Sequence, residues 1–251
     1  MNKIALITGG SRGLGRNMAL SMARKGIHSV ITYHANAGAA TEVVEEIKAL
    51  GQKAVALQLD TGDSTSFTGF ASSVRESLAD TWQRERLDFL VNNASIGRYA
   101  AIAETSEQQF DELMRVQLKG PFFLTQTLLP VIEDGGRIIN VSSGLARFSL
   151  AGYAAYAMMK GGIEVLTRYL AVELGPRRIR VNTIAPGAIE TDFSGGAVRD
   201  NEDLNKLIAA QTPLGRVGLP DDVGGVVAML LREEAGWING QRIEVAGGIH
   251  L

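Results

Sequence analysis

A tyrosine and a lysine lie four positions apart in the segment Tyr156-Ala157-Met158-Met159-Lys160. On a helix, this spacing places the two side chains on one face. Because a phenol has a pKa of about 10, forming the phenolate at neutral pH costs about 4 kcal/mol, and a neighbouring cation lowers that cost. The pair therefore predicts proton exchange between Tyr156 and a carbonyl or hydroxyl oxygen, assisted by Lys160. An exposed pair on an ordinary helix is the alternative interpretation.

Two serines end a predicted buried strand upstream of this pair, in the segment IINVSSG. The second of them, Ser143, is placed to bind the substrate oxygen. A serine pair after a strand can also simply begin a turn. We predict a catalytic role for Ser143 because it precedes the Tyr156 and Lys160 pair in a chain that also carries a glycine-rich loop.

That loop is the segment TGGSRGLG at residues 8–15, which lies between a predicted strand and a predicted helix. This order is typical of dinucleotide binding: Gly9 allows a tight turn, Gly13 lets the backbone approach a pyrophosphate, and Gly15 allows close packing of helix and strand. An ordinary turn is the alternative. The residues predicted to contact the cofactor here are Gly9, Ser11, Arg12, Gly13, Leu14 and Gly15.

The end of the second predicted strand decides which dinucleotide is preferred. Its segment VITYHAN contains no Asp or Glu to bind a ribose 2′-hydroxyl, and Arg12 offers a guanidinium suited to a 2′-phosphate. We therefore expect NADP(H) to be preferred, with NAD(H) as the alternative and with Tyr33 and His34 beside the phosphate. Asp60, after the third strand, is placed to accept from the adenine amino group. It could instead cap the next helix, a role that Ser64 could also fill.

Short β-branched runs alternate with helical stretches along the whole chain. The predicted strands are residues 4–8, 29–33, 54–59, 89–92, 137–141, 180–184 and 242–245. This alternation predicts an α/β fold, a single Rossmann-type doubly wound parallel sheet of about seven strands in the order 3-2-1-4-5-6-7, with helices on both faces. We expect one domain over residues 1–251. A lid-like substrate segment is expected near residues 190–219, with a helix near 201–211, although a surface excursion would show the same pattern.

The composition excludes several classes of protein. The chain has 251 residues, 45% of them hydrophobic, which is enough for a sizeable core. With no cysteine, disulfide scaffolds, thiolate zinc sites and cysteine nucleophiles are excluded, and we expect no metal. Scattered Lys and Arg and a net charge of −2 argue against nucleic acid as a partner. The N-terminal apolar run is too short for a signal peptide or a membrane span, and we expect a cytoplasmic protein.

Together these residues resemble the short-chain dehydrogenase/reductase family over nearly the whole chain. The motifs that carry the resemblance are Thr8-Gly9-xxx-Gly13-x-Gly15, Asn92-Asn93-Ala94, Ser143 with Tyr156 and Lys160, and Pro186-Gly187 with Thr191-Asp192. The resemblance implies that Ile189 and Thr191 hold the nicotinamide carboxamide and that Lys160 reaches the nicotinamide ribose. It adds to the expected cofactor contacts Thr61, Asn92, Ala94, Tyr156, Pro186 and Gly187. It also implies a 3-oxoacyl carrier-protein reductase-like C-terminal half, at 219–223 and 243–248, and a homotetramer or homodimer.

Two positions depart from the family pattern. Ser95 stands where the family usually has glycine, so a residue with a Cβ must make the turn beside the nicotinamide. Gln117 stands where the family places its fourth catalytic residue, an asparagine that helps to hold a water in a proton relay. Glutamine carries the same amide on a longer side chain. We expect Gln117 to be catalytic and activity to survive the replacement.

The sequence predicts an NADPH-dependent oxidoreductase that reduces a ketone or oxidises the corresponding secondary alcohol. A 3-oxoacyl thioester or another small carbonyl compound is the expected substrate, and Arg98 or Arg147 would meet an anionic one. The predicted pocket comprises residues 96–99, 145–148, Tyr153 and 188–207. Two alternatives remain: an NADP(H)-binding sensor or scaffold with weakened catalysis, suggested by Gln117 and Ser95, and a nucleotide-binding transferase such as a methyltransferase.

Overall fold

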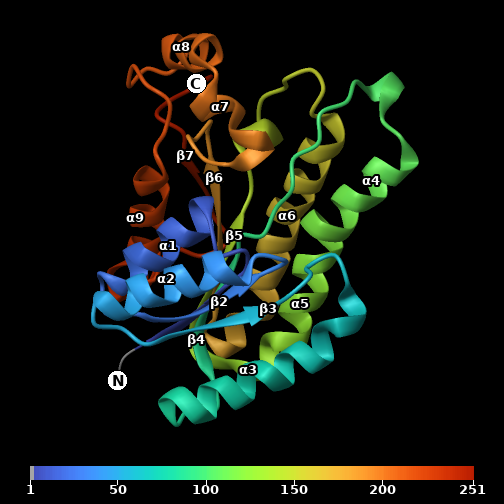
Figure 1. The fold of residues 1–251 in the computed structure, drawn as a ribbon. Coiled ribbons are helices and arrows are strands. Elements are labelled where there is room, and N and C mark those ends of the chain that lie inside the picture. Colours follow the sequence, from blue (N-terminus) through green and yellow to red (C-terminus); the bar gives the residue numbers. More distant parts are fainter. Residues whose placement is uncertain (1–2) are drawn as a thin grey trace.

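Short runs of aliphatic and β-branched residues form one sheet of seven parallel strands (Figure 1). The computed structural model describes residues 3–251. The strands are β1 (Ile4–Ile7), β2 (His28–Tyr33), β3 (Ala54–Gln58), β4 (Leu87–Asn92), β5 (Ile132–Val141), β6 (Arg180–Pro186) and β7 (Arg242–Val245). Their order is β3-β2-β1-β4-β5-β6-β7, which confirms the predicted sheet.

Successive residues of a central strand contribute to two different apolar cores, because side chains alternate across a sheet. In β1, Ala5 and Ile7 pack with helices α1, α2 and α9, whereas Ile4 and Leu6 pack with helices α3, α5 and α6. Both faces of the sheet are therefore covered, which explains why the strands are apolar at consecutive positions.

Helices α1, α2 and α9 form one of these layers and α3, α5 and α6 form the other, whereas α7 and α8 lie beyond the end of the sheet (Figure 1). Their bounds are α1 (Gly13–Ala23), α2 (Ala37–Ala49), α3 (Phe67–Trp82), α4 (Glu107–Met114), α5 (Gly120–Leu128), α6 (Ala154–Glu173), α7 (Ala197–Asp200), α8 (Glu202–Ala210) and α9 (Pro220–Leu230). A π-helical turn, η3 (Arg115–Lys119), joins α4 to α5. None of the helices in the part of the chain described could cross a membrane.

Strand β5 begins earlier than predicted. The sequence suggested a start at Arg137, because the preceding residues 133–136, EDGG, are typical of a turn. In the structure β5 starts at Ile132, which pairs with Leu87 of β4, and the register then shifts so that Arg137 pairs with Phe89. The two glycines are accommodated in this irregularity, which local sequence does not distinguish from a loop.

The segment at residues 190–219 leaves the sheet and returns to it at nearly the same point. Ile189 forms an isolated parallel bridge with Gly218, whose amide donates to the Ala188 carbonyl at 2.9 Å. Between these ends lie a 3-10 turn, η7 (Phe193–Gly196), and helices α7 and α8. The helix expected at 201–211 is α8, and its N-terminal amides are capped by Asn201, which accepts from Leu204 N at 3.0 Å.

Candidate active site

The glycine loop lies beyond the carboxyl end of β1, where β2 and β4 flank that strand and the chain order reverses. Gly9 and Gly13 have φ angles of +65° and +53°, which favour glycine. A Cβ on Gly15 would lie 2.1 Å from the Gly9 carbonyl oxygen, so only glycine allows α1 to begin this close to the loop. Ser11 and Leu14 are half-buried in the loop and the first turn of α1. The backbone amides of this turn form a cradle for a phosphate group.

Thr8 fastens this cradle to the end of β4. Its Oγ1 accepts hydrogen bonds from the backbone amides of Asn93 and Ala94, both at 2.9 Å, and Asn93 Nδ2 donates to the Thr8 carbonyl at 2.9 Å. Sequence analysis gave Asn93 no separate role, although it stands inside the motif Asn92-Asn93-Ala94. The contact holds the two loops of the predicted cofactor site in one fixed geometry.

The side chain of Asn92 lies in the protein interior, not at the cradle. Its Nδ2 donates to Thr125 Oγ1 at 3.0 Å and to Asn140 Oδ1 at 2.8 Å. Any contact of Asn92 with a cofactor must therefore involve its main chain. The physical reason is its position as the last residue of β4, where its side chain alternates toward α5.

The predicted adenosine end lies at the ends of β2 and β3. His34 is exposed, with its Nε2 atom 3.7 Å from the Asp60 carboxylate, and Tyr33 is half-buried. Asp60 accepts from the Gly62 amide at 2.7 Å and caps no helix, since Asp63 accepts from Thr65 N at the start of the following turn. The carboxylate of Asp60 therefore lies at the ends of β2 and β3, where the adenosine is expected.

The two remaining residues predicted at this end of the site are Arg12, which is exposed at the start of α1, and Thr61, which is half-buried.

Residues after β6 approach the same cradle from the other side. Pro186 ends β6, and the Gly187 amide donates to the Val245 carbonyl at 3.1 Å. Ile189 and Thr191 are both buried. A Cβ built on Gly13 would lie 3.7 Å from Thr191 Cβ, so the residues predicted for the nicotinamide lie against the glycine loop.

Tyr156 and Lys160 lie in the first turns of α6, and both are buried. Lys160 Nζ is 5.6 Å from the centroid of the Tyr156 ring and donates to the Val141 carbonyl at 2.9 Å. Burial lowers the pKa of Lys160 to about 7. Burial raises the pKa of Tyr156 to about 12, against the opposing effect of hydrogen bonds with the Ser95 and Ser143 side chains.

In the protein alone the pKa of this phenol is raised, and the assistance expected from Lys160 stays a prediction. Burial outweighs the hydrogen bonds of Tyr156, and it also favours the neutral form of Lys160, which weakens the attraction of that amine for a phenolate. The spacing of the pair is correct, but the desolvation of both groups could not be obtained from their spacing.

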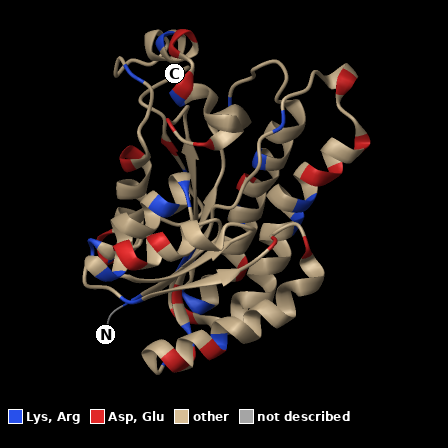
Figure 2. Cartoon of the chain, viewed as in Figure 1, with Lys and Arg blue, Asp and Glu red and all other residues tan. Residues whose placement is uncertain are grey.

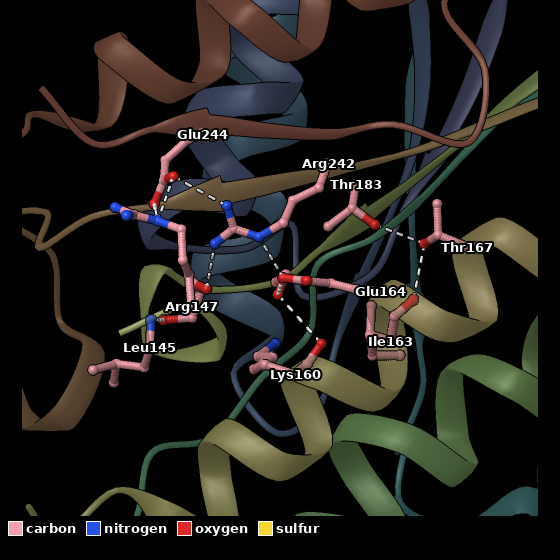
Figure 3. A network of polar contacts seen from close by, with 11 residues as sticks. Leu145, Arg147, Lys160, Ile163, Glu164, Thr167, Thr183, Arg242 and Glu244 are labelled. Carbon is pink, nitrogen blue, oxygen red and sulfur yellow. Dashed lines mark hydrogen bonds and ion pairs between the residues drawn. The ribbon is translucent and has the colours of Figure 1, made fainter. Parts of the chain in front are cut away.

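Ser143 follows β5 and is supported by a polar network that sequence analysis missed (Figure 3). Arg242 of β7 donates to the Ser143 carbonyl at 3.2 Å and to Glu164 Oε1 at 2.7 Å. Ser142 Oγ donates to the same Glu164 oxygen at 2.6 Å. Glu164 lies four residues after Lys160 on α6. This spacing places the two side chains on the same face of the helix, so the sequence could have indicated that Glu164 lies near Lys160.

Gln117 is buried in the π-helical turn η3, where its side-chain amide has two partners. Its Nε2 donates to the Ile96 carbonyl at 2.6 Å, and its Oε1 accepts from Ser95 Oγ at 2.8 Å. Ser95 is therefore in contact both with Gln117 and with the phenol of Tyr156. Sequence analysis treated Ser95 only as an unusual turn residue and did not identify this contact.

Aromatic rings surround the phenol of Tyr156. Tyr153 lies between Tyr99 and Tyr156, with centroid distances of 5.5 Å and 6.4 Å, and Phe193 from the excursion lies 6.0 Å from Tyr156. Tyr99 and Phe193 are also exposed, at 70% and 41%. We call this cluster of Tyr99, Tyr153 and Phe193 the entrance of the predicted pocket.

The two arginines expected to meet an anionic substrate are paired within the protein. Arg98 makes a two-point ion pair with Glu112, at 2.7 and 2.9 Å. Arg147 binds Glu244 and donates to the carbonyls of Ile249 and His250 near the C-terminus. Their positive charges are largely balanced by these partners, which leaves the entrance without a dominant cation.

Comparisons with known proteins agree with this geometry. A family model described as enoyl-(acyl carrier protein) reductase matches residues 9–250. A tetrahydroxynaphthalene reductase from Pestalotiopsis fici is 36% identical over 257 residues, covering 98% of this chain and 91% of the relative. Among solved structures, an angucycline C-6 ketoreductase with bound NADP is 36% identical with a TM-score of 0.93, covering 98% of this chain and 95% of the other.

A further solved structure is a short-chain dehydrogenase/reductase from Serratia marcescens. It is 31% identical, with a TM-score of 0.89, and the match covers 98% of this chain and 97% of the other. The chain therefore belongs to the short-chain dehydrogenase/reductase family and is an oxidoreductase.

Proposed function

We propose that this protein is an NADPH-dependent ketoreductase in which Tyr156 is the general acid, with Ser143, Lys160 and Gln117 as the other catalytic residues. The observation that carries the proposal is the position of the buried Tyr156 and Lys160 pair, which lies beside Ser143 at the same edge of the sheet as the glycine cradle. A ketone between these groups would meet a proton donor on one side and a cofactor on the other.

The residues at the cradle fit a dinucleotide. Gly15 leaves room where a Cβ would clash with the loop, Gly9 and Gly13 adopt positive φ angles, and the N-terminus of α1 supplies amide donors. Arg12 is exposed and strand β2 has no acidic residue of its own at its end, which suits the 2′-phosphate of NADPH. When bound, this cofactor supplies a hydride. The relatives with bound NADP support the same preference, with NAD(H) as the weaker alternative.

Side chains of the protein would donate the proton and stabilise the charge that remains. Ser143 would donate a hydrogen bond to the ketone oxygen, and Tyr156 would transfer its proton to that oxygen as the carbon is reduced. Because the pKa of Lys160 is about 7, its amine can exist as the ammonium at neutral pH and stabilise the phenolate that remains. In this step Tyr156 becomes a phenolate, while Lys160 keeps its proton and its positive charge.

The preferred substrate is a neutral, planar ketone. The entrance is bordered by Tyr99, Tyr153 and Phe193, which offer flat apolar surfaces. Arg98 and Arg147 already have acidic partners, so a carrier-linked or anionic 3-oxoacyl thioester gains little from them. The named activities of relatives on hydroxynaphthalenes and angucyclines support an aromatic ketone. The excursion at residues 190–219, which contributes Phe193, would act as the lid.

We also propose a cytoplasmic homotetramer that binds neither membranes nor nucleic acid. Acidic and basic residues are interspersed over the outer helices (Figure 2), which does not suit a polyanion. Apolar side chains on α5 and α6 are exposed: Phe122, Phe123, Met158, Val165, Tyr169 and Val172. Their burial between subunits is the simplest reason for them. Light scattering of the purified protein tests this assembly, and a monomer at micromolar concentration would contradict it.

A substrate panel with NADPH and NADH tests the function. We expect NADPH oxidation with bicyclic aromatic ketones, and slower turnover with a 3-oxoacyl thioester. Arg12→Ala is expected to reduce the preference for NADPH about tenfold, because one charge-assisted contact with the phosphate is lost. Equal efficiency with NADH in the unmodified protein would overturn the cofactor assignment, and NADPH binding without turnover of any ketone would favour a sensor.

A further inference from the structure

Two residues that depart from the family pattern, Ser95 and Gln117, connect the surroundings of the Tyr156 phenol to the protein interior. The Ser95 side chain opposes the rise in the pKa of Tyr156 on burial, and Ser95 Oγ is 2.8 Å from Gln117 Oε1. Gln117 Nε2 in turn lies 2.6 Å from the Ile96 carbonyl oxygen. This chain of contacts thus ends at a main-chain acceptor.

This last group fixes the direction of every hydrogen bond in the chain. A carbonyl can only accept, so Gln117 must present its NH₂ group to Ile96 and its oxygen to Ser95. The hydroxyl of Ser95 has one hydrogen, which it must donate to that oxygen. Only the lone pairs of Ser95 then remain for Tyr156, so the neutral phenol donates to Ser95. Gln117 is 1% exposed, which leaves water no route to compete for its amide.

When Tyr156 loses its proton, the direction of the hydrogen bond that it can form with Ser95 reverses. A phenolate can only accept hydrogen bonds, and so can the Gln117 oxygen. Both acceptors then require the single hydrogen of Ser95. A hydrogen bond to an ionised group is about twice as strong as one between neutral groups, so the phenolate competes better for it.

We propose that Ser95 is a positioning residue for the proton step, which accepts from the neutral phenol while donating to Gln117 and rotates to donate to the phenolate after transfer. When a ketone is bound, the phenol hydrogen turns from Ser95 to the substrate oxygen. In the transfer, which rests on the proposed function, the Tyr156 O–H bond breaks and an O–H bond forms on that oxygen. Ser95 keeps its own proton throughout. Gln117 opposes the rotation, because it loses its donor when Ser95 turns.

The other groups that face the phenol are the same in both states. Lys160 and Tyr153 come from its own helix, Ser143 comes from the end of β5, and Phe193 from η7 is apolar. Two cationic residues lie near the phenol: Lys160, and Arg98, which lines a small cavity with Tyr156 and is ion-paired with Glu112. A substitution at Ser95 or Gln117 leaves both of them in place.

The proposal predicts shifts of opposite sign for two substitutions. Ser95→Ala removes a donor to the phenolate, so the phenol should titrate about one pH unit higher. Gln117→Met removes the competing acceptor at similar side-chain length, which frees the Ser95 hydrogen for the phenolate, so the phenol should titrate lower. Ser95→Thr keeps the hydroxyl and should keep the original midpoint. A purely structural role for Ser95 and Gln117 would destabilise the protein without this pattern.

Fluorine NMR of the full-length protein labelled with 3,5-difluorotyrosine measures these midpoints, since the fluorine atoms bring phenol titration into an accessible pH range. The signal of Tyr156 is assigned by its absence in Tyr156→Phe. Ser72→Ala, on the exposed side of α3, is the control and should shift nothing. Shifts in the same direction for Ser95→Ala and Gln117→Met, or shifts no larger than that of the control, would overturn the proposal.

This titration needs neither substrate nor cofactor, so it separates the two proposals. Inactivity toward every ketone in the panel would refute the proposed function and leave these midpoints unaffected. If Gln117→Met does not fold, the comparison of Ser95→Ala with Ser95→Thr still decides, because equal midpoints for those two variants exclude a role for the hydroxyl.

Discussion

The cofactor cradle and the catalytic centre lie at the same edge of one sheet, yet they are built in different ways. The cradle consists of backbone amides and glycines in a loop whose geometry is local, between residues 8 and 15. The proposed catalytic centre consists of buried and half-buried side chains brought together from α6, η3, β7 and the segments that follow β4 and β5. A site made from backbone tolerates many side-chain changes, whereas a site made from buried polar groups depends on each partner.

The largest effect should come from Tyr156→Phe, which removes the proton donor and leaves the cradle intact. General acid catalysis contributes about 10² to 10⁴ in rate, so we expect kcat to fall by that factor while NADPH affinity is retained. Stopped-flow reduction of a responsive ketone measures the rate, and fluorescence titration measures the affinity. Unchanged kcat would remove Tyr156 from the mechanism.

The second effect concerns stability, and it follows from the lowered pKa of Lys160. The unfolded chain keeps this amine protonated up to a pH of about 10, whereas the folded protein releases the proton near pH 7. Between these values the unfolded state binds more protons, so the stability contributed by this group rises with pH, by a few kcal/mol in total. Below pH 7 the amine is protonated in both states, so the full free-energy cost of burying its charge lowers the stability of the folded protein.

Lys160→Met should therefore be more stable than the unmodified protein at pH 7, and the difference should shrink toward pH 10. Urea unfolding at several pH values measures it. Lys206→Met, which removes an exposed lysine paired with Glu202, is the matched control and should show no such trend. A difference independent of pH would mean that Lys160 is protonated in the folded protein.

A smaller effect is expected at the cradle. Gly15→Ala places a Cβ 2.1 Å from the Gly9 carbonyl oxygen, so the loop must move, and we expect NADPH affinity to fall about tenfold or more. Gly69→Ala, in α3 with open space around it, should instead stabilise the protein by about 0.5–1 kcal/mol. Isothermal titration and thermal unfolding measure the two results. Retained affinity in Gly15→Ala would show that the loop geometry is not required.

The smallest effect should come from the network behind Ser143. Arg242→Met leaves Glu164 without its cation and the Ser143 carbonyl without a donor, and we expect a loss of about 2 kcal/mol in stability with a several-fold lower kcat. The paired variant Glu164→Met/Arg242→Met should recover part of the stability, because no unpaired charge remains. Additive losses would show that the two residues act independently.

Local patterns were sufficient for the parts of the molecule whose physics is local. Consecutive apolar residues indicated strands covered on both faces, and the sheet order agrees with the prediction. The glycines after β1 indicated the cradle because only a turn with little steric room requires them. Strand β5 was predicted too short, since the glycines before Arg137 are equally compatible with a turn.

Ser95 and Gln117 show why the rest could not be obtained in this way. They are far apart in the sequence, and each was recognised only as a departure from a family motif. Their mutual hydrogen bond depends on the packing of the end of β4 against η3. Glu164 and Arg242 are a similar case, because the ion pair joins α6 to β7.

The sequence by itself determined the fold and the family, and it supplied the prediction that Tyr156 and Lys160 exchange a proton. Strand periodicity, glycine spacing and the Tyr156 and Lys160 interval are properties of neighbouring residues. Only the tertiary structure decided how these groups behave. Burial moves the pKa values of Tyr156 and Lys160 away from those of the free side chains, and the partners of Arg98 and Arg147 leave the entrance without a dominant cation. Desolvation and pairing depend on which distant residues surround a group, and packing alone sets that.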